Sequence, residues 1–240
     1  LTRYLAEGRA MADAAKAKGI IFRPDTDCRS HAYMHKVAML ARNADRLAAL
    51  AAESPDAIAL ACDVSDPAAL MSALDEAQAR AGAPRVVVHN AVGGAFADFL
   101  SVDPAVLEKN FQVNVMALMH LGRWAAPRME AAGGGALIVT GNTSAERGRA
   151  NFAAFAPTKA AQRILAESMA RTMGPRGVHV AYLVIDAAID LDWQRKLNPD
   201  KPDDYFCHPD DIAGEVWHLA HQPKSAWSFR AEIRPYGEVW

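Results

Sequence analysis

The sequence predicts an α/β fold, a doubly wound parallel sheet with helices on both faces in a three-layer α/β/α arrangement. Short apolar runs rich in β-branched residues alternate with Ala-rich stretches that repeat apolar residues at helical spacing. The chain has 240 residues, and 51% of them are hydrophobic, which is enough for one sizeable core. We therefore expect a single domain over residues 11–240, preceded by a weakly ordered extension over residues 1–10.

Seven short apolar runs have the length and composition of buried strands. They are residues 19–22, 36–40, 57–62, 85–89, 136–140, 178–185 and 228–233. Helices are expected between them, at "NADRLAALAAE", "DPAALMSALDEAQARA" and "PTKAAQRILAESMARTMG". Asp66 and Asp103 each precede a proline and predict helix N-caps, whereas Gly174 predicts a C-cap. The segment 190–209, rich in Asp and Pro, is expected to be an irregular insertion of the kind that covers a substrate.

Composition restricts the class of partner. A net charge of −2 and a pI near 6.5 leave no basic surface for nucleic acid or for an anionic membrane, and no apolar run approaches the ~20 residues of a membrane helix. Three widely spaced cysteines make a disulfide framework improbable. We expect a cytoplasmic protein with a small-molecule partner. The grouping of Cys207, His208, His218 and His221 lacks a known ligand spacing, so no metal site is predicted.

Four stretches in order resemble the short-chain dehydrogenase/reductase family from about Lys36 onward. They are "CDVSD", "HNAVGG", "NV" within "FQVNVMAL", and "FAPTK". The resemblance implies a Rossmann-type fold and hydride transfer between a nicotinamide cofactor and a carbonyl or hydroxyl group. It also implies a homodimer or homotetramer, because the family pairs two long helices, here residues 104–130 and 153–173, across a dimer axis.

Ligands of open parallel sheets lie across the carboxyl ends of the strands, where several polar residues of this chain occur. The cofactor-binding set implied by the resemblance is Arg42, Asn43, Asp63, Val64, Asn90, Ala91, Val92, Lys159 and Ile189. Asp63 and Val64 would contact the adenine, although Asp63 has a second interpretation as a strand-end cap. An arginine after the second strand accommodates a 2′-phosphate, so Arg42 implies NADP(H) rather than NAD(H). The alternative is that Arg42 only solvates the start of a helix.

The catalytic positions depart from the family pattern. The family uses a tyrosine, a lysine four residues later, a serine thirteen residues before the tyrosine, and a supporting asparagine. The matching residues here are Phe155, Lys159, Asn142 with Thr143 and Ser144 beside it, and Asn114. The Thr143 and Ser144 hydroxyls are candidates to polarise a carbonyl.

A phenyl ring has no proton to donate, and such a donor typically contributes about 10²- to 10⁴-fold to the rate. Phe155 is therefore either a core aromatic or the apolar floor of a ligand site, and Lys159 retains the role of holding the nicotinamide ribose. We expect an oxidoreductase with impaired hydride transfer. The alternative is a catalytically silent binding or scaffold protein with the same fold.

The glycine-rich phosphate loop of the family is missing. Only thirteen residues separate Phe22 from Lys36, and a crossover helix alone needs roughly eleven. Pro24 removes an amide donor, and Asp25 and Asp27 add negative charge where a diphosphate would lie. We hypothesise that residues 23–35 replace an ancestral loop and helix through a deletion or a change of reading frame. A further departure is Asp186 with Ala187, which replace the family's "PG" after the sixth strand.

Overall fold

The computed structural model describes residues 20–23, 36–54 and 56–238. The expected extension at residues 1–10 and nearly all of the segment 23–35 lie outside these ranges. The main sheet has seven strands in the order β3-β2-β1-β4-β5-β6-β9. The strands are β1 (Ile20–Arg23), β2 (Val37–Ala41), β3 (Ala57–Ala61), β4 (Val86–His89), β5 (Gly135–Gly141), β6 (Val178–Ile185) and β9 (Arg230–Ile233). This is the strand order of a doubly wound sheet, so the predicted fold class is confirmed.

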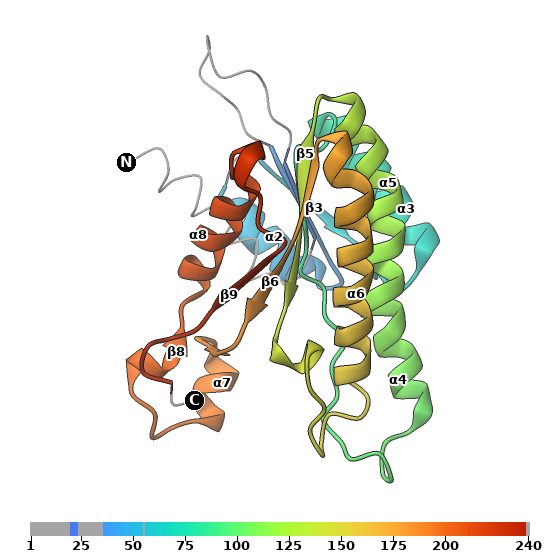
Figure 1. Cartoon of the computed structure of the whole chain (residues 1–240). Coiled ribbons are helices and arrows are strands. Elements are labelled where there is room, and N and C mark those ends of the chain that lie inside the picture. The colour runs from blue at the N-terminus through green and yellow to red at the C-terminus, as the bar shows by residue number, and fades with distance from the viewer. Residues whose placement is uncertain (1–19, 24–35, 55, 239–240) are drawn as a thin grey trace.

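The helices form one layer on each face of the sheet (Figure 1). On one side lie α2 (Ala44–Ala52) and α8 (Pro209–Ala220), and on the other lie α3 (Pro67–Ala81), α5 (Ala117–Ala131) and α6 (Ala156–Met173). A shorter helix, α4 (Pro104–Phe111), leads into α5 through a π-helical turn over Gln112–Met116. Within the described ranges, no helix combines the length and the apolarity needed to cross a membrane.

β1 departs from the predicted parallel sheet, because it runs antiparallel to both of its neighbours. Ile20 is paired with Leu40 and His89, and Arg23 is paired with Val86. The other strands of the main sheet pair in parallel. The carboxyl end of β1 therefore lies at the opposite edge of the sheet from the carboxyl ends of β2 and β4. The short connection favours this direction, because a parallel crossover helix alone would use roughly eleven of the thirteen residues between Phe22 and Lys36.

The predicted caps hold the ends of the helices on the α3–α6 side. The carboxylate of Asp66 accepts hydrogen bonds from the main-chain amides of Ala68 and Ala69, and Asp103 accepts one from Ala105. Each cap is worth about 1 kcal/mol. Helix α6 ends before Gly174 as predicted, but that glycine is right-handed. The left-handed glycine is Gly177, with φ of 83°, after one 3-10 turn.

The segment 190–209 is more regular than predicted. It contains the short helix α7 (Asp192–Leu197) and the strand β8 (Phe206–Cys207), which pairs with β7 (Ala188–Ile189) in a second small sheet. Arg195 joins the segment internally, since its guanidinium binds the carboxylates of both Asp190 and Asp203. The aspartates that led us to expect an irregular loop instead form this ion-pair network with Arg195.

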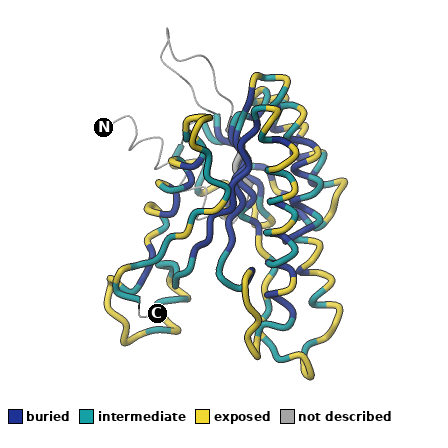
Figure 2. The backbone as a smooth tube through the Cα atoms, viewed as in Figure 1, coloured by how far each residue is buried: buried dark blue, intermediate teal, exposed yellow. Residues whose placement is uncertain are grey.

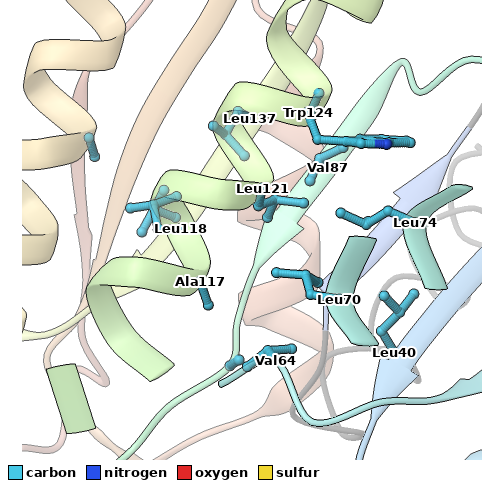
Figure 3. Close-up of a cluster of buried hydrophobic side chains, with 14 of the residues drawn as sticks. Leu40, Val64, Leu70, Leu74, Val87, Ala117, Leu118, Leu121, Trp124 and Leu137 are labelled. Carbon is cyan, nitrogen blue, oxygen red and sulfur yellow. The ribbon is translucent and has the colours of Figure 1, made fainter. Parts of the chain in front are cut away.

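The core fills both spaces between the sheet and its helices, and the buried strands lie between more exposed helical surfaces (Figure 2). On the α3–α5 side, Leu70 and Leu74 of α3 lie near Leu121 and Trp124 of α5 (Figure 3). Burying one such leucine contributes about 2 kcal/mol. This packing fixes α3 and α5 relative to the strands, and therefore fixes the strand ends at which the site lies.

Candidate active site

A pocket of about 340 Å³ lies at the carboxyl ends of β2, β3 and β4, against α4. Its lining includes Arg42, Asp63, Val64, Ala91 and Val92 from the predicted cofactor-binding set, together with Gly93, Gly94, Lys109 and Asn110. The structure thus brings together five residues that are far apart in the sequence. Asn43, Asn90 and Ile189 are not among the lining residues.

Charge is concentrated at the outer part of this pocket. Asp63 accepts hydrogen bonds from the Ser65 hydroxyl at 2.7 Å and the Ser65 amide at 3.0 Å, and these bonds lower the pKa of its carboxyl. The positive charges of Arg42 and Lys109 lower it further. Asp63 therefore caps its own turn, as one interpretation of the sequence expected, and also lines the pocket. Arg42 and Lys109 give this part of the pocket an excess of positive charge.

The other predicted cofactor residues have structural roles in the described chain. Asn43 is the N-cap of α2, with its side-chain oxygen accepting from the Arg46 amide at 2.9 Å. The Asn90 side-chain oxygen accepts a hydrogen bond from the Thr140 hydroxyl at 2.7 Å, between β4 and β5. Ile189 lies in β7 and pairs with Cys207. These contacts fix the walls of the site.

Phe155, which we predict from the sequence to match the family's tyrosine, belongs to a cluster of three aromatic rings. Its ring centroid lies 5.5 Å from that of Phe96 and 6.2 Å from that of Phe152, and these two are 5.0 Å apart. Phe155 is 5% exposed, whereas Phe96 is 65% exposed and covers it. The ring also faces Gly94, where an added Cβ would stand 3.7 Å away. Phe155 therefore packs as a core aromatic, in contact with Gly94 of the pocket lining.

Lys159 points into the protein. It follows Phe155 by one turn of α6, is 2% exposed, and donates from Nζ to the Thr140 carbonyl at 3.0 Å and to the Gln162 side-chain oxygen. Burial lowers the pKa of its ammonium to about 7. In the described structure, the lysine expected to hold a ribose is bound to two neutral oxygens of the protein interior.

Asn114 connects the end of β4 to α6 from within the π-helical turn. Its side-chain oxygen accepts from the Gly93 amide at 2.9 Å, and its side-chain nitrogen donates to the Gly93 carbonyl at 2.9 Å and to the Thr158 hydroxyl at 2.8 Å. Single π-helical turns occur often at functional sites. Asn114 thus clamps the turn that follows β4, and its supporting role in catalysis stays a prediction.

The polar group after β5 is held by its own neighbours. The Asn142 side-chain oxygen accepts from the Ser144 amide at 3.1 Å, and the Thr143 hydroxyl donates to the Asp186 carboxylate at 2.7 Å. The second oxygen of Asp186 binds Arg234. The ion pair with Arg234 stabilises the Asp186 carboxylate, which stands where the sequence analysis expects the family's proline. The other carboxylate oxygen accepts the Thr143 proton that a substrate carbonyl would need. Ser144 lines a separate pocket of about 330 Å³.

Two buried titratable residues that the sequence did not place lie close to the site. The ring of Tyr182 covers Gly141, where an added Cβ would meet the ring carbon Cζ at 2.0 Å, and burial raises the pKa of the phenol. The Tyr182 phenol is therefore a weaker acid than an ordinary tyrosine. His89 is fully buried at the end of β4, and burial, with the nearby charge of Lys159, lowers its pKa to about 3. It is neutral at physiological pH.

Sequence reasoning missed Lys109 and Gln162. Lys109 lies on α4, and only the packing of that helix against the strand ends brings it beside Arg42. Gln162 follows Lys159 by three residues and is fully buried. The signal available in the sequence was its position three residues after Lys159 on the same helix, which places the two side chains next to each other.

A pocket at the carboxyl ends of the strands, in a sheet with this strand order, is typical of dinucleotide-binding α/β proteins. The chain belongs to the short-chain dehydrogenase family, whose model, described as "short chain dehydrogenase", matches residues 29–201. The 7alpha-hydroxysteroid dehydrogenase of Escherichia coli (strain K12) is 28% identical over 179 residues, which are 71% of this chain and 69% of that protein. Its name describes an oxidoreductase.

Solved structures agree with this assignment. A short-chain dehydrogenase from Rhodopseudomonas palustris matches with a TM-score of 0.73 and 31% identity, over 97% of this chain and 94% of that one. An NADPH-bound short chain oxidoreductase from Pseudomonas aeruginosa PAO1, described as containing an atypical catalytic center, matches with a TM-score of 0.72 over 82% and 84% of the two chains. Its 20% identity shows the shared fold alone.

Proposed function

We propose that the chain is an NADP(H)-linked oxidoreductase acting on a carbonyl or hydroxyl group of a small molecule, with impaired proton transfer. The observation that carries this proposal is the pocket at the carboxyl ends of β2 to β4, which places Arg42 and Lys109 beside Asp63. Two cations near one carboxylate leave a net positive charge for a 2′-phosphate. An adenine against Val64 and Ala91 would lie between apolar walls.

The fit of a dinucleotide differs along its length. The adenosine half fits the pocket described above. At the diphosphate position, the edge of the sheet holds the amino end of β1 rather than a strand leading into a helix. The described residues therefore provide no glycine turn there, and we infer that cofactor affinity depends mainly on the adenosine half.

Among the described residues, the reaction end lacks a strong proton donor. A bound nicotinamide would supply the hydride chemistry, and the residues of this chain would have to orient the substrate and move a proton. Phe155 has no proton to give, burial makes the Tyr182 phenol a weaker acid by raising its pKa, and the Thr143 hydroxyl donates to Asp186. Ser144 is the hydroxyl that we propose for polarising a substrate carbonyl. Turnover should accordingly be slow.

A fluorescence titration with NADPH and with NADH tests this proposal on the intact chain. We expect saturable NADPH binding, about tenfold or more tighter than NADH binding, because only NADPH carries the 2′-phosphate. Failure of both cofactors to bind at millimolar concentration would contradict it.

A catalytically silent binding or scaffold protein is the second candidate function. The observation that favours it is that Lys159 and Thr143, two groups with a role in the first proposal, both donate to acceptors of the protein itself. The titration separates the two functions, since the silent protein would bind neither cofactor.

We also propose that a second copy of the chain covers the apolar groove between α5 and α6, giving a homodimer or homotetramer. The groove encloses about 460 Å³, with Gly122, Leu165 and Met169 among its lining residues.

Cys62 and Cys207 are free and buried, in keeping with the reducing cytoplasm that the sequence predicts, whereas Cys28 lies outside the described residues.

A further inference from the structure

A buried glutamine stands beside the lysine of the site and has no part in the chemistry above. Gln162 lies three residues after Lys159 on α6, and its side chain is fully buried. Placing an amide in a protein interior is costly unless both its oxygen and its nitrogen find partners. Its contacts therefore indicate why it is tolerated there.

Both ends of the Gln162 amide are hydrogen-bonded. Its nitrogen donates to the main-chain carbonyl of Asn114 at 2.9 Å, and its oxygen accepts from Lys159 Nζ. Lys159 Nζ also donates to the Thr140 carbonyl at 3.0 Å. The result is a continuous chain of contacts from the π-helical turn through the amide to the ammonium and on to β5.

We propose that Gln162 is the positioning residue for Lys159, holding its amine between β5 and the π-helical turn and determining how strongly that amine retains a proton. The effect of Gln162 on cofactor binding rests on the function proposed above. The effect of Gln162 on the protonation of Lys159 does not, because every contact involved lies within the protein.

The charges around Lys159 support this role. Its two acceptors are neutral oxygens, which stabilise an ammonium less than a carboxylate does. His89 of β4 is the titratable group that senses the charge of Lys159, and it is itself uncharged above about pH 4 because its pKa is near 3. Thr140 of β5, Asn114 of the π-helical turn and Gln162 of α6 carry no charge. The amide of Gln162 is therefore the side-chain acceptor on which the protonated form of Lys159 depends, among the described residues.

NMR titration of the cofactor-free full chain, labelled with ¹³C at lysine Cε, measures this directly. The Lys159 signal is assigned by its loss in Lys159→Met. We expect a titration midpoint near pH 7 in the unaltered protein. Gln162→Leu should lower the midpoint by about one pH unit, because an acceptor is lost, and Gln162→Glu should raise it by about two, because a carboxylate takes its place.

A control variant separates positioning from simple packing. Gln78→Leu removes a half-buried amide of α3 that accepts a hydrogen bond from Arg128 of α5, and it should leave the Lys159 midpoint unchanged. A purely structural role for Gln162 would lower the melting temperature of its variants without moving the midpoint. Equal midpoints in the unaltered protein and Gln162→Glu would overturn the proposal, even if Gln162→Leu failed to fold.

Cofactor titrations across pH provide the second measurement. NADPH affinity should fall as pH rises through the Lys159 midpoint, since Lys159 is the residue proposed to hold the nicotinamide ribose and a neutral amine is a weaker hydrogen-bond donor than an ammonium. The pH of this loss should follow the midpoint in Gln162→Glu. Absence of NADPH binding in every variant would refute the proposed function, while the NMR midpoints would still decide the role of Gln162.

Discussion

The two ends of the site use their polar residues in opposite ways. At the adenosine end, the Arg42 and Lys109 side chains are exposed and line a pocket. At the reaction end, Asn114, Lys159 and Gln162 are at most 2% exposed, and they bind one another and the main chain. The first arrangement is open to a ligand, whereas the second is satisfied without one. Binding and turnover are therefore separable properties of this fold.

Restoring the missing acid is the strongest way to break this comparison. Phe155→Tyr should raise NADPH-dependent reduction of a panel of aldehydes and ketones by about 10²-fold or more, because it supplies a proton donor one turn before Lys159. Phe152→Tyr, in the same ring cluster, is the control and should change nothing. An inactive Phe155→Tyr variant that still binds NADPH would show that the reaction end is not arranged for hydride transfer.

The closed character of the reaction end also predicts acid sensitivity. The pKa of His89 is about 3 in the folded protein against 6.5 for a free histidine, so the unfolded chain takes up a proton first as pH falls. The unfolding free energy should therefore drop between about pH 6.5 and pH 3, by up to about 1.4 kcal/mol per pH unit from this residue. Urea unfolding at several pH values should show a shallower decline in His89→Asn.

The exposed His218 of α8 offers a comparison for that measurement. His218→Asn replaces an exposed imidazole and is the control variant. A decline in His89→Asn as steep as in the unaltered protein would mean that the His89 imidazole is not excluded from solvent as the structure shows.

The smallest expected effect sharpens the description of the adenosine end. Arg42→Ala and Lys109→Ala should each weaken NADPH binding by about tenfold and leave NADH binding nearly unchanged, since each removes a charge facing the 2′-phosphate. Arg46→Ala, on the exposed surface of α2, is the control. Equal losses for NADPH and NADH would mean that these cations contact another part of the cofactor.

Local sequence patterns were sufficient for most of the fold. The caps at Asp66 and Asp103 depend on residues within a few positions, and buried strands such as β6 are legible as apolar runs. The direction of β1 could not be predicted from its composition, because a short buried strand has the same composition in a parallel and an antiparallel sheet. The thirteen residues after Phe22 did give one indication, since a parallel crossover helix would leave only about two of them for its turns.

The candidate site was predictable in position but less so in contacts. Motif spacing placed Asp63, Val64 and Ala91 correctly at strand ends, and the pocket joins them. Motif spacing could not predict the hydrogen bonds that these residues make in the folded protein. Nothing local to Thr143 shows that its proton goes to Asp186, forty-three residues away, and nothing local to Lys159 shows that it turns inward.

The contact between Gly141 and Tyr182 has a consequence for anyone redesigning this enzyme fold. The phenol ring occupies the volume that a side chain at position 141 would need. A larger residue at position 141 therefore requires a smaller one at position 182, on the neighbouring strand. A larger residue at position 141 alone would overlap the Tyr182 ring. A graft of a conventional catalytic loop after β5 should therefore exchange both residues together.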